Sequence, residues 1–298
     1  MVALLLACAL ASAPSMRAQR LPARGDDWSS VDRALGRSGT LNPSDVMKYS
    51  FPRGDLQVTA YGVALKPALA LGSWLAFKKE KGTATMVMGD LVLTEDEVDP
   101  VMRALQAGGV QETALHNHVL GESPRVMYMH VFAMGDAATI AQTVRSAFEH
   151  THTPLSAPAP ASASSAPVEL DTTAIAQVLG FTGRVNGGVY QVSVPRREVI
   201  RHGGMVVPPA MGVATALNFQ PTGTGRAAVT GDFVLVAGEV NAVTRALREN
   251  DIAVTAIHSH MLDEQPRLYF MHFWGNDDAV KLARGLAAAL HQMAVKRG

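Results

Sequence analysis

Residues 116–137 read HNHVLGESPRVMYMHVFAMGDA, and residues 258–279 read HSHMLDEQPRLYFMHFWGNDDA. The same offset of 142 positions aligns 84–150 with 226–292 without a gap, and 25 of the 67 aligned positions are identical. Further matches with small gaps extend each copy to about 120 residues, which is the size of a domain rather than of a solenoid repeat. The sequence therefore predicts one fold that is present twice.

A stretch rich in Pro, Ala and Ser separates the two copies. Residues 151–170 read THTPLSAPAPASASSAPVEL, a composition that buries little surface and favours an extended linker. We therefore predict a first repeat over 26–150 and a second repeat over 171–298. Residues 1–25 are expected to be a signal peptide or a disordered N-terminus.

Composition excludes several classes of function. The 298 residues contain 26 Lys and Arg against 26 Asp and Glu, so the chain lacks the basic excess of a nucleic-acid binder. The single cysteine, Cys8, permits neither an internal disulfide nor a zinc site built on cysteines. No P-loop, dinucleotide fingerprint or nucleophile elbow is present.

The N-terminal residues favour export. Met1 to Ala13 read MVALLLACALASA, an apolar run with a small-residue end that is typical of a secretory signal. Cys8 fits loosely to the processing box of a bacterial lipoprotein, in which it would carry a lipid anchor. No later segment has 18 uninterrupted apolar residues, so we expect no transmembrane helix and a periplasmic or extracellular location.

Periodicity predicts an α+β fold for each copy, roughly β-β-β-α-β-β-α, with an antiparallel sheet and two helices on one face. The Gly-Asp pairs at 89–90 and 231–232 predict a bend or turn within their strands. The predicted strands include 86–93, 113–120, 126–132, 189–194 and 228–236.

Two signals predict the helices. Thr94 and Glu97 form a capping box, followed by apolar residues with the spacing of one helix face, and Gly108-Gly109 ends that helix. Asp136 is a good N-cap for a final helix. The core stripe of this final helix, with its counterpart in the second copy, is Ile140, Val144 and Phe148, and Leu282, Leu286 and Leu290.

A hairpin can bring histidines together in each copy. Alternation along a strand places His116 and His118 on one face, and His130 on the same face of the next strand. If the hairpin turns about Pro124, His118 lies opposite His130 and Glu122 lies at the loop mouth. The second copy repeats the pattern with His258, His260, Glu264 and His272.

Three imidazoles and one carboxylate suit a divalent first-row transition metal, namely Zn, Mn, Fe, Ni or Cu. The predicted ligands are His116, His118, Glu122 and His130, with His258, His260, Glu264 and His272. A metal-free polar or catalytic cluster and a purely structural histidine network are the alternatives. The sequence leaves open whether the copies form two sites or share one.

Other residues of the pattern have two interpretations each. Arg125 and Arg267 can bind a carboxylate or phosphate of a small anionic ligand, or pair with a neighbouring acidic residue. Asp90 and Asp232 can orient or deprotonate a group at the cluster, or serve the turn. The methionines Met127, Met129 and Met271 alternate with the histidines and are expected to pack in the core, with copper ligation as the alternative.

The quoted segments resemble the LppY/LpqO family, also described as the domain of unknown function DUF1259, over most of both halves. The resemblance implies a bacterial protein, commonly exported or a lipoprotein, and it implies no activity. Three hypotheses follow: a metal-dependent periplasmic enzyme, which would hydrolyse or oxidise a small molecule; a non-catalytic protein of the envelope that binds a metal or small ligand; or a structural envelope protein without metal.

Overall fold

The computed structural model describes residues 27–80, 82, 84–156 and 168–297. The expected export segment and Cys8 lie outside the described residues. The elements of the first repeat are α1 (Ser29–Leu35), β1 (Thr40–Asn42), η1 (Pro43–Asp45), β2 (Val46–Pro52), β3 (Thr59–Ala60), β4 (Val63–Ala64), α2 (Pro67–Ala70), β5 (Gly72–Lys79), β6 (Thr85–Thr94), α3 (Glu95–Ala107), β7 (Gln111–His116), β8 (Glu122–Ser123), β9 (Val126–Gly135) and α4 (Ala137–Phe148).

The second repeat follows the same order with small differences. Its elements are α5 (Thr172–Leu179), β10 (Arg184–Asn186), β11 (Val189–Pro195), β12 (Arg201–His202), β13 (Met205–Val206), η2 (Pro209–Met211), β14 (Ala214–Gly223), β15 (Arg226–Leu235), α6 (Ala237–Arg248), β16 (Ala253–His258), β17 (Glu264–Gln265), β18 (Tyr269–Asp278) and α7 (Ala279–Leu290).

Each repeat is built on a six-stranded antiparallel sheet. The strand order is β1-β2-β5-β6-β9-β7 in the first repeat and β10-β11-β14-β15-β18-β16 in the second. The predicted α+β class and the duplicated architecture are therefore confirmed. Each repeat also has a helix that the sequence pattern did not predict, α1 or α5, which packs against α4 or α7.

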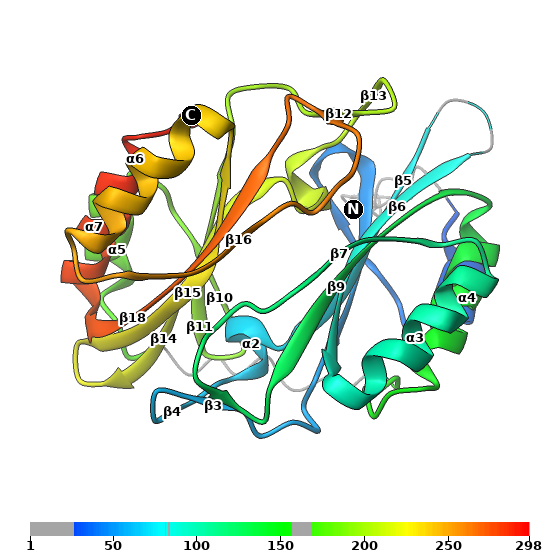
Figure 1. Ribbon diagram of the computed structural model, residues 1–298, viewed down its shortest axis with the longest axis horizontal. Coiled ribbons are helices and arrows are strands. Elements are labelled where there is room, and N and C mark those ends of the chain that lie inside the picture. Colours follow the sequence, from blue (N-terminus) through cyan, green and yellow to red (C-terminus); the bar gives the residue numbers. More distant parts are fainter. Residues whose placement is uncertain (1–26, 81, 83, 157–167, 298) are drawn as a thin grey trace, which may run out of the picture.

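The helices cover one face of each sheet, and the two sheets face each other (Figure 1). In each repeat one apolar cluster joins the sheet to its helices. The cluster of the first repeat includes the predicted stripe of Ile140, Val144 and Phe148. Two further clusters combine residues of both repeats, such as Met88 with Phe270 and Tyr128 with Trp274. The resulting order of layers is helix, sheet, sheet, helix.

Capping and ion pairing attach the helices to the sheets in the same way in both repeats. Asp136 accepts a hydrogen bond from Thr139 N at 2.8 Å, and the Glu97 carboxylate accepts one from Thr94 N at 2.9 Å, as the capping signals predicted. Fully buried Arg53 donates to Glu97 at 2.7 Å and to the carbonyl of Val92 at 2.7 Å. Arg196 contacts Glu239 and Val234 equivalently in the second repeat.

A short segment of each repeat reaches over the sheet of the other. From the first repeat, α2 contacts β14 and β15, and the carbonyl of Ala68 accepts a hydrogen bond from Gln191 Nε2 at 2.8 Å. From the second repeat, η2 contacts β5, where the ring of Trp74 lies against Gly212. The repeats are therefore interlocked, and their mutual orientation is set by buried contacts on both sides.

Two local predictions were wrong. Gly89 and Asp90 lie within continuous β6 and form no turn; a Cβ at Gly89 would lie 2.8 Å from the Trp74 carbonyl oxygen, so close strand approach explains this glycine. His118 does not lie opposite His130, because β7 ends at His116. The residue paired with His130 is Ala114, after a register shift in β7.

Residues 151–156 of the Pro/Ala/Ser-rich stretch lie against the first repeat. Arg37 Nη2 donates to the carbonyls of Pro154, Leu155 and Ser156 at 3.1–3.2 Å. Within the part of the chain that the structure describes, no helix is both long enough and apolar enough to span a membrane.

Candidate metal centre

Six histidines from both repeats meet in one place between the two sheets. We call this place the imidazole chamber; it is formed by His116, His118, His130, His258, His260 and His272. Two groups within it offer ligand atoms that all lie within 4.8 Å of one another: His116, His258, His260 and His272, and His116, His118 and His130. The structure therefore joins the two predicted clusters into one.

The three closest contacts between rings of the chamber, two stacked and one tilted, each join one ring from each repeat. The centroid distances are 3.5 Å for His116–His258, 3.5 Å for His130–His260 and 3.9 Å for His118–His272. Tyr128 stacks on His118 at 3.3 Å and Phe270 stacks on His260 at 3.5 Å, which closes the outer ends. These exchanged partners show that the repeats are related by a pseudo-twofold axis.

The backbone holds this arrangement through a reciprocal pair of hydrogen bonds. Thr113 Oγ1 donates to the carbonyl of His260, and Thr255 Oγ1 donates to the carbonyl of His118, both at 2.5 Å. Because Thr113 and Thr255 are equivalent positions on the edge strands β7 and β16, each repeat positions the His-x-His segment of the other. The alignment of the two copies shows that these threonines are identical. Their partners, however, lie in the other repeat.

The Nδ1 atoms of several rings are engaged by backbone carbonyls. His272 Nδ1 lies 2.7 Å from the Gly231 carbonyl oxygen, and His116 Nδ1 lies 3.0 Å from that of Asn117. A carbonyl accepts only from N–H, so these rings carry their proton on Nδ1 and a lone pair on Nε2. The Nε2 atoms of all six rings are buried without a hydrogen-bond partner.

Burial keeps the imidazoles neutral. It lowers the pKa of His116 to about 4 and that of His258 to about 3, with repulsion from His116 adding to the effect on His258. The pKa values of the other four rings lie well below the usual value, because burial dominates and the neighbouring imidazoles repel a proton. Neutral imidazoles with free Nε2 lone pairs are metal ligands by chemistry.

Two aspartates face the Nε2 atoms. An Asp90 oxygen lies 3.8 Å from His118 Nε2 and the other lies 3.9 Å from His130 Nε2, while an Asp232 oxygen lies 3.5 Å from His260 Nε2. Burial raises the pKa of Asp90 to about 8, against the opposing effect of Lys48, and raises that of Asp232 well above its usual range. The duplicated Gly-Asp pair was the sequence signal for these residues.

The two glutamates of the predicted ligand set lie apart from these groups. Glu122 Oε1 accepts a hydrogen bond from Val126 N at 3.2 Å, and Glu264 Oε1 accepts one from Leu268 N at 2.8 Å. Glu122 Oε2 is buried without a partner, and burial raises the pKa of this carboxyl to about 7. Neither glutamate belongs to the two groups within 4.8 Å, and neither do Asp90 and Asp232, whose oxygens lie 3.5–3.9 Å from single Nε2 atoms.

The two arginines differ between the repeats. Arg267 Nη1 lies 3.3 Å from Glu264 Oε2 and donates to the carbonyl of Leu262 at 2.9 Å, so it braces its own loop. Arg125 is 68% exposed and has Glu95 at 3.7 Å. The prediction of an acidic partner within the loop is thus confirmed for Arg267, whereas the partner of Arg125 is at the start of α3.

The methionines that alternate with the histidines face the helices. Met129 and Met271 are fully buried in the apolar clusters between each sheet and its helices. The prediction that they pack in the core is confirmed for these two, which lie on the sheet face opposite the imidazole chamber, whereas Met127 is half-buried and belongs to none of the four apolar clusters.

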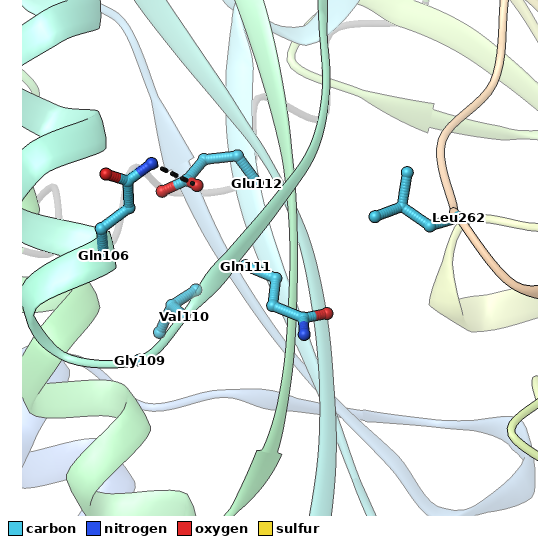
Figure 2. A pocket seen from close by; sticks show the side chains of 6 residues that line it. All are labelled: Gln106, Gly109, Val110, Gln111, Glu112 and Leu262. Carbon is cyan, nitrogen blue, oxygen red and sulfur yellow. Dashed lines mark hydrogen bonds between the residues drawn. The ribbon is translucent and has the colours of Figure 1, made fainter.

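A shallow cavity of about 390 Å³ lies at the start of β7, on the edge of the first sheet. Figure 2 shows Leu262 of the second repeat across from Gln111 at the start of β7, with Gln106 hydrogen-bonded to Glu112. None of the six histidines lines this cavity, whose residues are Gln106, Gly109, Val110, Gln111, Glu112 and Leu262.

Comparison with known proteins finds a family for both halves of the chain. The family model described as Domain of Unknown Function (DUF1259) matches residues 29–150 and 173–292. None of the curated proteins matches the chain.

Two solved structures are weakly similar to the chain. The trimeric bacterial microcompartment shell protein PduB is 10% identical, with 85% of this chain and 89% of that chain covered and a TM-score of 0.20. EtuB from Clostridium kluyveri is 11% identical, with 85% and 90% covered and a TM-score of 0.20. Likenesses of this strength support no conclusion about fold or function.

Proposed function

The chain belongs to the family described as Domain of Unknown Function (DUF1259), and we propose that it binds divalent first-row transition metal ions between its two repeats. The observation that carries the proposal is the set of six Nε2 atoms, all buried in one chamber and all without a hydrogen-bond partner. The ligand atoms lie within 4.8 Å of one another in two groups, so small shifts of the rings would bring them to the roughly 3–4 Å that separates ligands of one ion.

Energetics favour a bound ion over a structural histidine network. A buried polar atom without a partner destabilises a fold by about 1–3 kcal/mol, and here six such atoms face one another. A structural network would satisfy these nitrogens with hydroxyl, carboxyl or backbone groups, as the Nδ1 atoms of His116 and His272 are satisfied. A metal ion accepts several lone pairs at once and removes the deficit.

The donors narrow the choice of ion. Imidazole nitrogen suits Zn, Cu, Fe and Ni, whereas Mn favours sites dominated by carboxylate, carbonyl and water. Met129 and Met271 pack against the helices, on the sheet faces opposite the chamber, so they supply no sulfur to it. We therefore expect Zn, Cu, Fe or Ni in preference to Mn.

We further propose that the protein acts in the cell envelope after export. The support is the apolar, small-residue run from Met1 to Ala13, with Cys8 as a candidate for lipid attachment. Mass spectrometry of protein recovered from the host would test this: a mature N-terminus downstream of Ala13, or a diacylglyceryl group on Cys8, supports export. An intact Met1 in a cytoplasmic fraction contradicts it.

Elemental analysis of natively purified protein tests metal binding. We expect bound transition metal that is lost in the double variant His116→Ala with His258→Ala. The matched control is His150→Ala with His291→Ala, which removes two exposed histidines outside the chamber and should leave the metal content unchanged. Absence of metal in the wild type, even after incubation with Zn²⁺, would contradict metal binding and leave the metal-free hypotheses, a polar or catalytic cluster, a small-ligand binder or a structural envelope protein.

A second candidate function, a metal-dependent hydrolase, is favoured by polar groups found only in the first repeat. The Tyr128 hydroxyl and Glu122 Oε2 are buried without partners, and burial, with the charge of Glu122 adding to it, raises the pKa of Tyr128. Their counterparts are Phe270 and a Glu264 held by Arg267. A carboxyl with a pKa of about 7 is suited to general acid–base catalysis, and exposed Arg125 could hold an anionic substrate group.

Hydrolysis of p-nitrophenyl acetate and p-nitrophenyl phosphate by the zinc-loaded protein tests this second function. We expect Glu122→Gln to abolish turnover while metal content is kept, and Glu264→Gln to leave turnover intact. Metal-loaded protein without turnover of either probe favours the non-catalytic binding protein.

A further inference from the structure

We propose that Asp90 and Asp232 are metal ligands and that the imidazole chamber holds two ions, one for each aspartate. This inference rests on the proposed metal-binding function and specifies its ligands and its stoichiometry. The two ligand sets are His116, His118, His130 and Asp90, and His258, His260, His272 and Asp232.

The spacing of the aspartate oxygens is that of atoms sharing an ion. Two ligand atoms that each lie about 2.0–2.2 Å from one metal are separated by roughly 3–4 Å. The separations from Nε2 are 3.8 Å and 3.9 Å at Asp90 and 3.5 Å at Asp232. Hydrogen bonds between such groups are shorter, at about 2.7–3.2 Å, so these contacts are too long for direct hydrogen bonding.

The side of the ring that Asp90 faces argues against an orienting role. A carboxylate that orients a metal-bound histidine accepts from the ring N–H that points away from the metal. In this protein backbone carbonyls engage Nδ1 of His116 and His272. Asp90 instead faces Nε2 of both His118 and His130, the atoms that carry no other contact.

One oxygen of each aspartate lacks a hydrogen-bond partner. Oδ1 of Asp90 and Oδ1 of Asp232 are buried and accept no hydrogen bond. The side chains are 9% and 15% exposed, so bulk water solvates them little. A buried carboxylate is expected to be paired or to coordinate a metal. The imidazoles within 4 Å of these oxygens are kept neutral by burial, while the charge of Lys48 acts on Asp90 and the backbone N–H of Met271 acts on Asp232.

Strand pairing places each aspartate equivalently. Asp90 on β6 is paired with His130 on β9, and Asp232 on β15 is paired with His272 on β18. Each aspartate therefore sits beside a chamber histidine on the inner face of its own sheet. The preceding glycine in each repeat lets the neighbouring strand approach closely at this point.

Donor number and symmetry favour two ions over one. Six imidazoles and two carboxylates exceed the four to six ligands that a first-row transition metal accepts. An ion held by Asp90 lies off the pseudo-twofold axis, so the same geometry recurs at Asp232. Two sets of three histidines and one aspartate provide four protein ligands for each ion and place two carboxylate charges against two divalent cations.

Equilibrium dialysis against Zn²⁺, read by elemental analysis, tests the inference on the full chain. We expect two equivalents in the wild type, one in Asp90→Asn, one in Asp232→Asn, and none retained at the same free Zn²⁺ in the double variant. Asparagine keeps the size of aspartate, and circular dichroism checks that each variant is folded. Glu122→Gln is the matched control and should retain two equivalents.

Co²⁺ is a second probe, and its absorption spectrum is a readout that does not depend on the number of bound ions. Replacing a carboxylate ligand changes the ligand field, so the visible absorption of the Co²⁺ protein should change in Asp90→Asn and stay unchanged in Glu122→Gln. Two equivalents of Zn²⁺ with an unaltered Co²⁺ spectrum in both aspartate variants would overturn the assignment of these ligands. A single equivalent would overturn the two-ion proposal and leave metal binding standing, whereas no bound metal would overturn both proposals.

Discussion

The imidazole rings of His116 and His258 stack with their centroids 3.5 Å apart, although the two residues belong to different repeats. They end the equivalent edge strands β7 and β16, and the pseudo-twofold axis passes between them. Each half of the chamber therefore borders the other half through this pair, so the complete site requires both repeats.

Single substitutions of this central pair should have matching effects. We expect His116→Ala and His258→Ala each to weaken Zn²⁺ binding by at least about 100-fold at one site, since loss of a ligand should exceed the effect of losing a residue that only orients one. Competition with a chelator of known affinity measures the change. A large loss in one variant and none in the other would contradict the equivalence of the two halves.

The buried ion pair of Arg53 is expected to matter far more than an exposed one. Arg53→Met leaves Glu97 buried at 3% exposure without its cation, and breaking such a pair costs about 3–5 kcal/mol of unfolding free energy. The control Arg103→Met removes an exposed pair with Asp99 and should change stability by less than about 1 kcal/mol. Urea unfolding measures both; similar losses in the two variants would show that burial of the pair is unimportant.

Glu122 makes stability depend on pH in an unusual direction. Its pKa of about 7 lies above the ordinary value of 4.5, so between these values the folded state binds a proton that the unfolded state has released. The contribution of Glu122 to the free energy of unfolding is fully present below about pH 4.5, and it is lost as the pH rises through 7.

Removal of the Glu122 carboxyl should therefore favour the fold most at high pH. In chelator-treated protein, we expect the Tm of Glu122→Gln to gain on that of the wild type as pH rises from 5 to 8. The exposed Glu149→Gln serves as the control and should show no such trend. A constant difference in Tm between Glu122→Gln and the wild type would refute the proposed protonation.

The glycine before each chamber aspartate is required by packing. A Cβ at Gly231 would overlap the Ala216 carbonyl oxygen on the paired strand, so Gly231→Ala must push β14 and β15 apart. We expect a loss of about 2 kcal/mol or more of unfolding free energy, and weaker Zn²⁺ binding because Asp232 moves with the strand.

Gly238 provides the matched control for this substitution. It lies in α6 with open space at its Cβ position, so Gly238→Ala should raise the unfolding free energy by up to about 1 kcal/mol through better helix propensity. Thermal unfolding and Zn²⁺ dialysis of both variants provide the comparison. Normal stability of Gly231→Ala would mean that the strands have room that the structure does not show.

Local signals predicted the helices with strong caps and the faces of the strands. The capping box at Thr94, the N-cap at Asp136 and the stripe through Val144 involve residues within one or two turns of each other, so their energetics can be read from neighbours. Helix α1 was missed because its seven residues are too few to establish a periodic pattern. The register opposite His130 was missed because a shift between Glu112 and Ala114 has no local signature.

The sequence by itself determined that the fold is duplicated and that each copy carries three histidines, two of them on neighbouring strands, because repetition and alternation are properties of residue order. Only the tertiary structure decided that the two sheets face each other and merge both sets, with Asp90 and Asp232 against the Nε2 atoms. The physical reason is that these contacts arise between strands distant in the chain, where packing of two complete sheets sets the distances and no neighbouring residue records them.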